Sequence, residues 1–479
     1  MNKELKRVSI AVLLMFVALF SSTTVITVFQ ADSLNADGRN VRTLYDSYSA
    51  ERGPILVDGQ AIAESKPSND QYKFQRVYSN PELYSAVTGY FTLNQGTTGV
   101  EGSLNNYLSG TANDQFLSKI SSILTGQDPK GASVSLTINP KAQQAAFDGL
   151  GNNSGAVVAI DPKTGAILAM VSKPSYNPNL LASHNTNDVI ATYKQLLAAP
   201  TQPLINRAIA GDLYHPGSVF KLVVASAAID SGKYTPDSQF PNPPTLQLPN
   251  SNTVITNAEG ENCGGTPTVS IATALRLSCN IPFAQLGEAL GADTIAKYAK
   301  AYGYGDDFSV PMAVTPSTYP INTDPAKLML SSFGQDEDRV TPLQIAMTSA
   351  AIANKGILMS PTLIKQIDAP DLTPIQPFQE KAYGQPISAQ TSATLTQLMV
   401  ADVNDGAASN ARIDGVDVAG KTGTAQNGTG RPYTLWFTGF APANDPQVAV
   451  AVVVENGTSF GNVVAAPIAK QVIEAVLNK

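Results

Sequence analysis

The segment Tyr214-His-Pro-Gly-Ser-Val-Phe-Lys221 is the part of the sequence that decides the fold. It places Ser218 and Lys221 at the start of an apolar run, at a spacing that puts both side chains on one helix face. A serine hydroxyl becomes a useful nucleophile when a neighbour takes its proton, and a lysine made neutral by its surroundings can do so. The run Val223–Ala228 is apolar on nearly all sides, which predicts a buried helix over 218–229 and a lowered pKa for its lysine. Because Ser-x-x-Lys also arises by chance in long chains, the pair needs support from the rest of the sequence.

The composition of the chain argues against several classes of function. A length of 479 residues is enough for two or three domains. The formal net charge of -7 gives no electrostatic basis for binding nucleic acid. The two histidines and two cysteines show no zinc-ligand spacing, so the sequence predicts neither a metal site nor a cofactor.

The N-terminal segment is predicted to anchor the protein in the cell membrane. Residues 8–29 are uncharged, mostly apolar and long enough to cross a bilayer as a helix. Lys3, Lys6 and Arg7 precede this run, so the positive-inside rule predicts a cytoplasmic tail over residues 1–7 and an extracytoplasmic location for the rest. The alternative is a cleaved signal peptide. The length of the run and the lack of an Ala-x-Ala site after it favour a retained single-pass anchor.

The two cysteines of the chain, Cys263 and Cys279, would then lie in a compartment where disulfides persist. A bridge between them would stabilise the fold by about 3 kcal/mol on the chain-entropy model. The alternative is a pair of buried free thiols, because sequence does not give their separation in space.

Residues 30–140 are predicted to form a mixed, β-rich domain without a catalytic arrangement. Segments 75–79 and 86–91 are predicted as strands, and 52–59 as a strand closed by an Asp-Gly turn. Segment 99–108 is predicted as a loop that enters a short helix. We interpret this region as a pedestal between membrane and enzyme, which serves dimerisation or partner binding.

Residues 141–479 are predicted to form one large α+β domain. Segment 155–171 contains two apolar strands joined by a turn at Asp161–Gly165, and their lack of alternation predicts that both faces of the sheet are covered by helices. A strand through Lys421, two further strands at 433–440 and 447–455, and a terminal helix at 466–477 close the chain. The pattern predicts an antiparallel sheet built from both ends of the domain.

Two further polar triplets lie between these elements. Ser278-Cys279-Asn280 interrupts a helix that Ser270 caps, and it points two short polar side chains to one place. Lys421-Thr-Gly423 lies on a predicted strand. Segment 415–422 also fits a phosphate-binding loop, but glycines and a proline follow it instead of the helix that such a loop opens.

Together, Ser218-x-x-Lys221, Ser278-x-Asn280 and Lys421-Thr422-Gly423 resemble the signature of penicillin-binding proteins and class A β-lactamases. The longer matches Tyr-x-Pro-Gly-Ser-x-Phe-Lys and Gly-Lys-Thr-Gly-Thr-Ala-Gln are similar to class B penicillin-binding proteins, as are segments 155–170 and 341–344. The upstream Glu51-Arg-Gly-Pro-Ile and Gly99-Val-Glu-Gly fit the pedestal domain of that family. The chain looks most like its short, single-pass actinobacterial type. His215 and Asp336 depart from it, because many members carry an acidic residue and a second glycine there.

The resemblance implies a fold and a role for each site residue. It implies a penicillin-binding, serine β-lactamase-like transpeptidase domain after the pedestal. Ser218 would attack the carbonyl between two D-alanines, and Lys221 would take its proton, directly or through Ser278. Asn280 would hold Lys221 and bind the substrate amide. The backbones of Ser218 and Thr424 would form the oxyanion hole. Lys421, Thr422 and Thr424 would bind the terminal carboxylate, while Gly423 would let the donor peptide lie along the strand edge.

The same resemblance implies the partners and leaves alternative functions open. Stem peptides of lipid II-derived strands would be the substrates, β-lactams the inhibitors, and a membrane glycosyltransferase of division or elongation the probable partner. A D,D-carboxypeptidase or β-lactamase shares the triplets but gives the acyl group to water. A penicillin-binding sensor or scaffold is a further alternative. Segment 30–140 is too short to hold a glycosyltransferase of its own.

Overall fold

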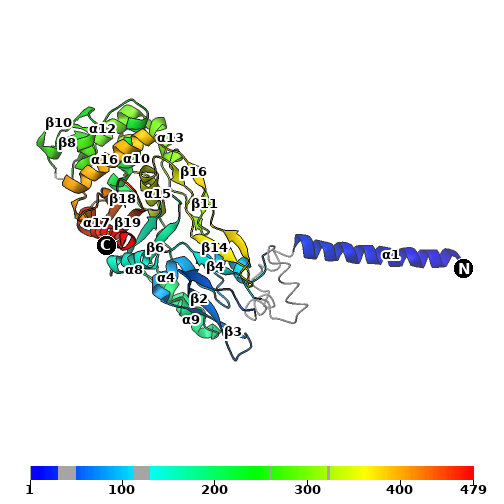
Figure 1. Cartoon of the computed structure of the whole chain (residues 1–479). Helices are drawn as coiled ribbons and strands as arrows, with labels where there is room; N and C mark the ends of the chain where they lie inside the picture. The colour runs from blue at the N-terminus through cyan, green and yellow to red at the C-terminus, as the bar shows by residue number, and fades with distance from the viewer. Residues whose placement is uncertain (1, 31–49, 113–129, 259, 321–323, 479) are drawn as a thin grey trace.

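The computed structural model describes residues 2–30, 50–112, 130–258, 260–320 and 324–478 (Figure 1). At the N-terminus, helix α1 (Asn2–Thr24) continues into the π-helical turn η1 (Val25–Phe29). The stretch Leu5–Thr27 is long and apolar enough to cross a membrane, and it is not buried against the rest of the protein. A helix of this kind is compatible with a single-pass membrane protein. It begins before the predicted span of 8–29 and includes the basic residues that precede it.

The pedestal region is built on a six-stranded sheet with the strand order β15-β14-β4-β1-β2-β3. Strand β1 pairs parallel with β4, and the other neighbours are antiparallel. The predicted Asp58-Gly59 turn joins β1 to β2. The strands are β1 (Ile55–Val57), β2 (Gln60–Pro67), β3 (Phe74–Tyr78), β4 (Ser133–Leu136), β14 (Ile364–Asp368) and β15 (Pro374–Pro377). The last two strands come from far along the chain and extend the sheet beyond β4.

The predicted strand at 86–91 is wrong, because helix α4 (Pro81–Thr88) occupies its first half. Pro81 stands at the first helical position, where its missing N–H costs nothing. Tyr84, Val87 and Thr88 are buried at helical spacing, so the period of the apolar residues outweighs the β-branched composition. Further along, α6 (Asn105–Leu108) confirms the predicted short helix, but the predicted loop before it is wrong, because α5 (Gly99–Ser103) is also helical.

The second sheet is fully antiparallel, with the order β17-β18-β19-β5-β6. Its strands come from both ends of the C-terminal region, as predicted: β5 (Gly155–Ile160), β6 (Ile167–Lys173), β17 (Ala419–Ala425), β18 (Tyr433–Ala441) and β19 (Val448–Gly457). Strand β17 is the first in the order, so one of its edges faces the helical part of the molecule.

Both faces of this sheet are buried, which explains the lack of alternation in its strands. Along β5, Ala156 and Val158 belong to one hydrophobic core, and Val157 and Ala159 to another. Helices α8 (Pro140–Leu150) and α17 (Gly461–Leu477) cover one face, while α15 (Pro342–Ala353) packs on the other (Figure 1). Helix α17 begins five residues before the predicted start at 466.

A helical region carries the predicted site. Its first turn is the 3-10 turn η4 (Gly217–Phe220), followed by α10 (Lys221–Asp230), α11 (Ile271–Arg276), α12 (Asn280–Leu290) and α16 (Ala389–Asp405). Helix α10 is buried along most of its length, as predicted. The remaining elements are η3 (Pro178–Leu180), α9 (Thr186–Ala198), β7 (Gln239–Pro241), β8 (Thr245–Gln247), β9 (Val254–Thr256), η5 (Cys263–Gly265), β10 (Thr268–Ser270), α13 (Ala292–Ala301), β11 (Phe308–Ser309), β12 (Ala313–Val314), α14 (Pro325–Ser331), β13 (Leu358–Met359), β16 (Ala382–Gly384) and η6 (Ser409–Ala411).

Candidate active site

Ser218 and Lys221 lie where the root of α10 meets strand β17. Gly217 precedes the serine with a φ of +54°, and a Cβ there would sit 3.1 Å from the Cβ of Ala425 on β17. Its N–H donates to the carbonyl oxygen of Gly334 at 2.8 Å. Glycine is therefore required by both the left-handed backbone and the close approach. These constraints hold Ser218, whose surface is 9 % exposed, directly beside the sheet edge.

Lys221 is fully buried and makes two hydrogen bonds at its tip. Its Nζ donates to the carbonyl oxygen of Ser278 at 2.8 Å and to Oδ1 of Asn280 at 2.9 Å. Burial first, and then the nearby charge of Lys421, lowers the pKa of Lys221 well below its usual range. A neutral amine has two hydrogens and one lone pair, so the two acceptors use both hydrogens and leave the lone pair for a proton.

Ser278 owes its orientation to the way helix α11 ends. The N–H of Ser278 donates to the carbonyl of Leu275 at 3.2 Å, and that of Cys279 donates to Ala274 at 2.8 Å. These two bonds form a Schellman motif, whose turning residue adopts a left-handed conformation. Ser278 has a φ of +61° at this position, where glycine is usual. The turn directs its carbonyl to Lys221 and lets α12 begin at Asn280, so the predicted break in the helix is confirmed.

Lys421 is the second fully buried lysine of the site, and its partner was not predicted from the sequence. Its Nζ lies 3.2 Å from Oδ2 of Asp402, and both side chains have zero exposure. Burial raises the pKa of Asp402 to about 6, although the charge of Lys421 opposes this shift. Asp402 continues the buried stripe of Leu395 and Met399 along α16. An acidic residue on an otherwise apolar helix face is the one signal in the sequence that could have identified Asp402.

Strand β17 places its small and polar residues on two faces. A Cβ on Gly423 would lie 3.1 Å from the carbonyl oxygen of Pro216, so this face approaches the serine turn closely. On the other face, Oγ1 of Thr422 donates to the carbonyl of Ala407 at 3.2 Å. Oγ1 of Thr424 accepts from the N–H of Gly461, also at 3.2 Å. Both threonine hydroxyls therefore contact backbone groups of neighbouring segments in this structure.

His215 and Asp336, the two residues that depart from the family pattern, both contact the side chain of Arg339. Nη1 of Arg339 lies 2.8 Å from Nδ1 of His215 and donates to the carbonyl of Asp336 at 3.1 Å. Because an arginine can only donate, Nδ1 accepts and the ring proton sits on Nε2. Burial, and then Arg339, lowers the pKa of His215. Asp336 has a φ of +66°, a left-handed backbone conformation that glycine adopts without strain.

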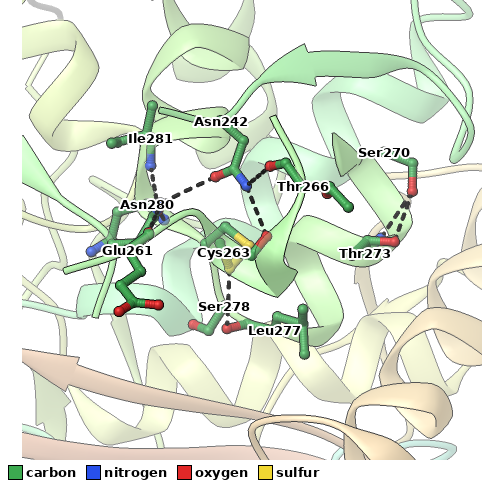
Figure 2. The surroundings of a disulfide bond; sticks show 12 residues. Asn242, Glu261, Cys263, Thr266, Ser270, Thr273, Leu277, Ser278, Asn280 and Ile281 are labelled. Carbon is green, nitrogen blue, oxygen red and sulfur yellow. Dashed lines mark hydrogen bonds between the residues drawn. A yellow bond between two sulfur atoms is a disulfide. The ribbon is translucent and has the colours of Figure 1, made fainter. Parts of the chain in front are cut away.

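A disulfide joins Cys263 to Cys279, with 5.8 Å between the Cα atoms. The predicted bridge is thus confirmed over the alternative of free thiols. It ties the loop after β9 to the residue between Ser278 and Asn280 (Figure 2). Cys279 is fully buried, so the bridge lies inside the wall of the site.

The assembled groups suit acyl transfer to a serine. A hydroxyl, a buried amine held by two acceptors, and a buried lysine–aspartate pair converge from η4, α10, α11, α12, α16 and β17. Among the residues that the structure describes, no group of three or more His, Cys, Asp or Glu side chains is placed to hold a metal ion.

The sequence and the fold of the chain are similar to those of known proteins. Residues 155–474 match the penicillin binding protein transpeptidase domain, and residues 52–134 match the penicillin binding protein A dimerisation domain. The chain is 41 % identical over 492 residues to the peptidoglycan D,D-transpeptidase PbpA of Mycolicibacterium smegmatis, covering 100 % of both. It is 42 % identical over 490 residues to PbpA of Mycobacterium tuberculosis, covering 100 % of this chain and 99 % of that one. The structure of a ceftriaxone acyl-enzyme complex of M. tuberculosis penicillin-binding protein A superposes with a TM-score of 0.87 at 41 % identity, covering 90 % of this chain and 100 % of that one. The chain belongs to the class B penicillin-binding proteins, the family of serine D,D-transpeptidases that cross-link peptidoglycan.

Proposed function

We propose that Ser218 is the residue acylated during cross-linking and that Lys221 is its base. Ser218 Oγ attacks the carbonyl between the two terminal D-alanines of a stem peptide, while its proton passes to the lone pair of Lys221 Nζ. The observation that carries this assignment is the tip of Lys221, which donates to Ser278 O and Asn280 Oδ1 at 2.8 and 2.9 Å. Its lowered pKa supplies the neutral form that a base needs.

The second half of the reaction releases D-alanine and forms the cross-link. The C–N bond breaks, and the departing amine takes a proton from the Ser278 hydroxyl, which Lys221 replenishes. An amine from a second stem peptide then attacks the ester and takes the acyl group. The proton that this amine loses passes through Ser278 and Lys221 to Ser218 Oγ, which leaves the ester as a hydroxyl. Ser278 is suited to the relay because its backbone carbonyl already binds Lys221.

The charge that develops on the attacked oxygen is stabilised by the backbone N–H groups of Ser218 and Thr424. The position of β17 at the sheet edge supports docking of the donor peptide as an added strand. Gly423, which was expected to give that peptide room, instead allows the close approach of the serine turn. Lys421 provides positive charge for the terminal carboxylate of the substrate. Thr422 and Thr424 bind that carboxylate by exchanging their present backbone contacts for the ligand.

The domain boundaries that we propose are a cytoplasmic tail at 1–7, a transmembrane anchor at 8–29, a pedestal at 30–140 and a transpeptidase domain at 141–479. The two matched family segments, 52–134 and 155–474, lie within the last two. The helix through Leu5–Thr27 supports the anchor, with the N-terminus in the cytoplasm and catalysis outside. A membrane glycosyltransferase is the partner that would supply nascent strands to an enzyme in this position.

The direct test is to label the full-length protein in detergent with a fluorescent penicillin and to map the labelled peptide. We expect the label on Ser218 and none on a Ser218→Ala variant. Labelling at another residue would overturn the assignment.

A second assay supplies a stem-peptide thioester together with a D-amino acid. Transpeptidation transfers the acyl group to the D-amino acid and gives the exchanged product. Hydrolysis alone would instead favour the carboxypeptidase or β-lactamase alternative.

A further inference from the structure

Helix α12, which begins at Asn280, has no capping side chain of its own. Its N-cap residue is Cys279, whose sulfur forms the disulfide and gives no cap hydrogen bond. The first N–H groups of a helix lack partners within the helix. Here they are bound from outside: Oδ1 of Asn257 accepts from the N–H of Asn280 at 2.9 Å and from that of Ile281 at 3.1 Å.

The end of strand β9 also fixes the side chain of Asn280. Nδ2 of Asn280 donates to the carbonyl oxygen of Thr256 at 3.0 Å. Because this contact requires the amide nitrogen on the β9 side, the amide oxygen is directed to Nζ of Lys221. Two consecutive residues, Thr256 and Asn257, therefore set the position and the orientation of Asn280.

Asn257 is itself held by a second buried amide. Its Nδ2 donates to Oδ1 of Asn242 at 3.1 Å and to the carbonyl of Glu261 at 3.2 Å. Nδ2 of Asn242 in turn donates to the carbonyls of Cys263 and Thr266 at 2.7 and 2.9 Å (Figure 2). The two asparagines are 3 % and 0 % exposed. We call this pair, Asn257 and Asn242, the amide brace.

We propose that Asn257, supported by Asn242, is a positioning residue for acylation: it holds Asn280 where its amide oxygen aims the lone pair of Lys221 at Ser218. This inference rests on the proposed roles of Ser218, Lys221 and Asn280. The amide brace touches neither substrate nor the reacting atoms. It acts through Asn257 Oδ1, which accepts from the N–H groups of Asn280 and Ile281, and the side chain of Asn280 then meets Lys221.

An ordinary structural role makes a different prediction. If the amide brace only stabilised its loop, removing it would lower the melting temperature without changing the chemistry of the folded protein. If it positions Asn280, the rate constant for acylation within the bound complex falls while non-covalent binding of the inhibitor is retained. Misplacing a base by a fraction of an ångström slows chemistry strongly, because proton transfer depends on geometry.

The test uses the full-length chain in detergent and measures benzylpenicillin acylation by stopped flow, separating the acylation rate constant from the dissociation constant of the initial complex. We expect Asn257→Ala to reduce the rate constant about tenfold with little change in the dissociation constant. Asn257→Asp keeps an acceptor oxygen for the two N–H groups but replaces the Nδ2 donor to Asn242 and Glu261 by an oxygen, so it is expected to recover part of the rate. Ser392→Ala is the matched control. It deletes a buried hydroxyl that donates to the carbonyl of Ile352 at 2.6 Å, far from the brace in the chain.

Three results would overturn the inference: an Asn257→Ala rate constant equal to that of Ser392→Ala, a loss confined to the dissociation constant, or no recovery in Asn257→Asp. If Asn257→Ala does not fold, Asn242→Ala, which removes only the support, must still slow acylation about threefold, and an unchanged rate would equally overturn it. Failure of the proposed function is distinct, because wild type would then not be acylated on Ser218, or Asn280→Ala would react as fast as wild type.

Discussion

Among the residues that the structure describes, a cluster of buried charged groups in the pedestal and another in the site differ in how well each group is paired. In the pedestal, the two oxygens of Glu101 accept from Nε of Arg52 at 2.5 Å and from Nε of Arg76 at 2.6 Å. Arg52 also donates to the backbone carbonyl of Glu101 at 2.6 Å. In the site, Asp402 has a single lysine at 3.2 Å, and the other lysine of the cluster, Lys221, binds only uncharged oxygens.

The pKa shifts of the two carboxyls follow from this difference. Burial alone would raise the pKa of Glu101, but two arginines outweigh it and hold the pKa below its usual value. One lysine does not outweigh burial at Asp402, so its pKa rises to about 6. A buried carboxylate with two arginine partners keeps its charge and stabilises a fold, whereas one with a single lysine partner has a raised pKa and can exchange protons more readily.

The largest effect is expected from breaking the site cluster at Lys221. Lys221→Met keeps the volume of the side chain but removes the lone pair, so acylation of Ser218 by benzylpenicillin should fall by about a thousandfold. The thermal midpoint should change little or rise, because a buried amine is replaced by an apolar group. Stopped-flow acylation and calorimetry on the same sample measure both. A rate within tenfold of wild type would contradict the role of Lys221 as base.

Breaking the pedestal cluster should have the reverse outcome. Glu101→Gln leaves two buried guanidinium groups without a counter-charge, and we expect a loss of about 3 kcal/mol or more in the free energy of unfolding. The acylation rate per folded molecule should be unchanged. Chemical denaturation and active-site titration measure the two quantities. Glu51→Gln is the control: it removes an exposed ion pair with Lys130, in which the two side chains are 36 % and 57 % exposed, and should cost little.

An intermediate effect is expected at the disulfide, which stabilises the fold and also contacts the site. Cys263→Ser should lower the free energy of unfolding by about 2 to 3 kcal/mol on the chain-entropy model. Unlike the change at Glu101, it should also slow acylation, because Cys279 separates Ser278 from Asn280. The Cys263→Ser variant and wild type treated with a reductant should show the same loss in the free energy of unfolding and the same decrease in acylation rate. A variant that loses stability but reacts at the wild-type rate would show that the bridge does not act on the site.

The smallest expected effect is a difference in how the stability contributions of Asp402 and Glu101 depend on pH. The pKa of Asp402 is raised from 3.8 to about 6, so its contribution to stability is complete below about pH 4 and is lost as the pH rises through about 6. The pKa of Glu101 is lowered, so its contribution is complete above its usual value of 4.5 and is lost as the pH falls. Denaturation of wild type and Asp402→Asn between pH 4 and 7 should therefore show wild type losing about 1 to 2 kcal/mol relative to the variant. If the unfolding free energies of wild type and Asp402→Asn differed by the same amount at every pH, the raised pKa of Asp402 would be contradicted.

The parts of the fold that depend on local pattern were predicted from the sequence. The apolar strands β5 and β19, the buried helix α10 and the break at Ser278 each have a local cause, and all were confirmed. The last three residues of helix α4 belong to segment 86–91, which was predicted as a strand, whereas the buried residues of α4 follow helical spacing. The motifs also predicted which residues lie beside Lys221, because the spacing within each triplet determines where its polar side chains point.

Other parts of the site depend on contacts between distant segments, which no local pattern reports. Asp402 reaches Lys421 from the far end of α16, and Asn257 reaches Asn280 from the end of β9. Their residue types are ordinary for their positions, and only the packing of the elements makes them partners. The assignment of strands β14 and β15 to the pedestal sheet is non-local in the same way.

This last pairing bears on how the protein is made. Strand β4 lies between β1 and β14, so one of its edges has no partner until residues 364–368 have been synthesised. An unpaired strand edge is a template for pairing with other chains. During synthesis the N-terminal part of the sheet therefore stays open on one side until nearly half of the chain has followed it. A fragment that ends at residue 140 would keep that open edge permanently.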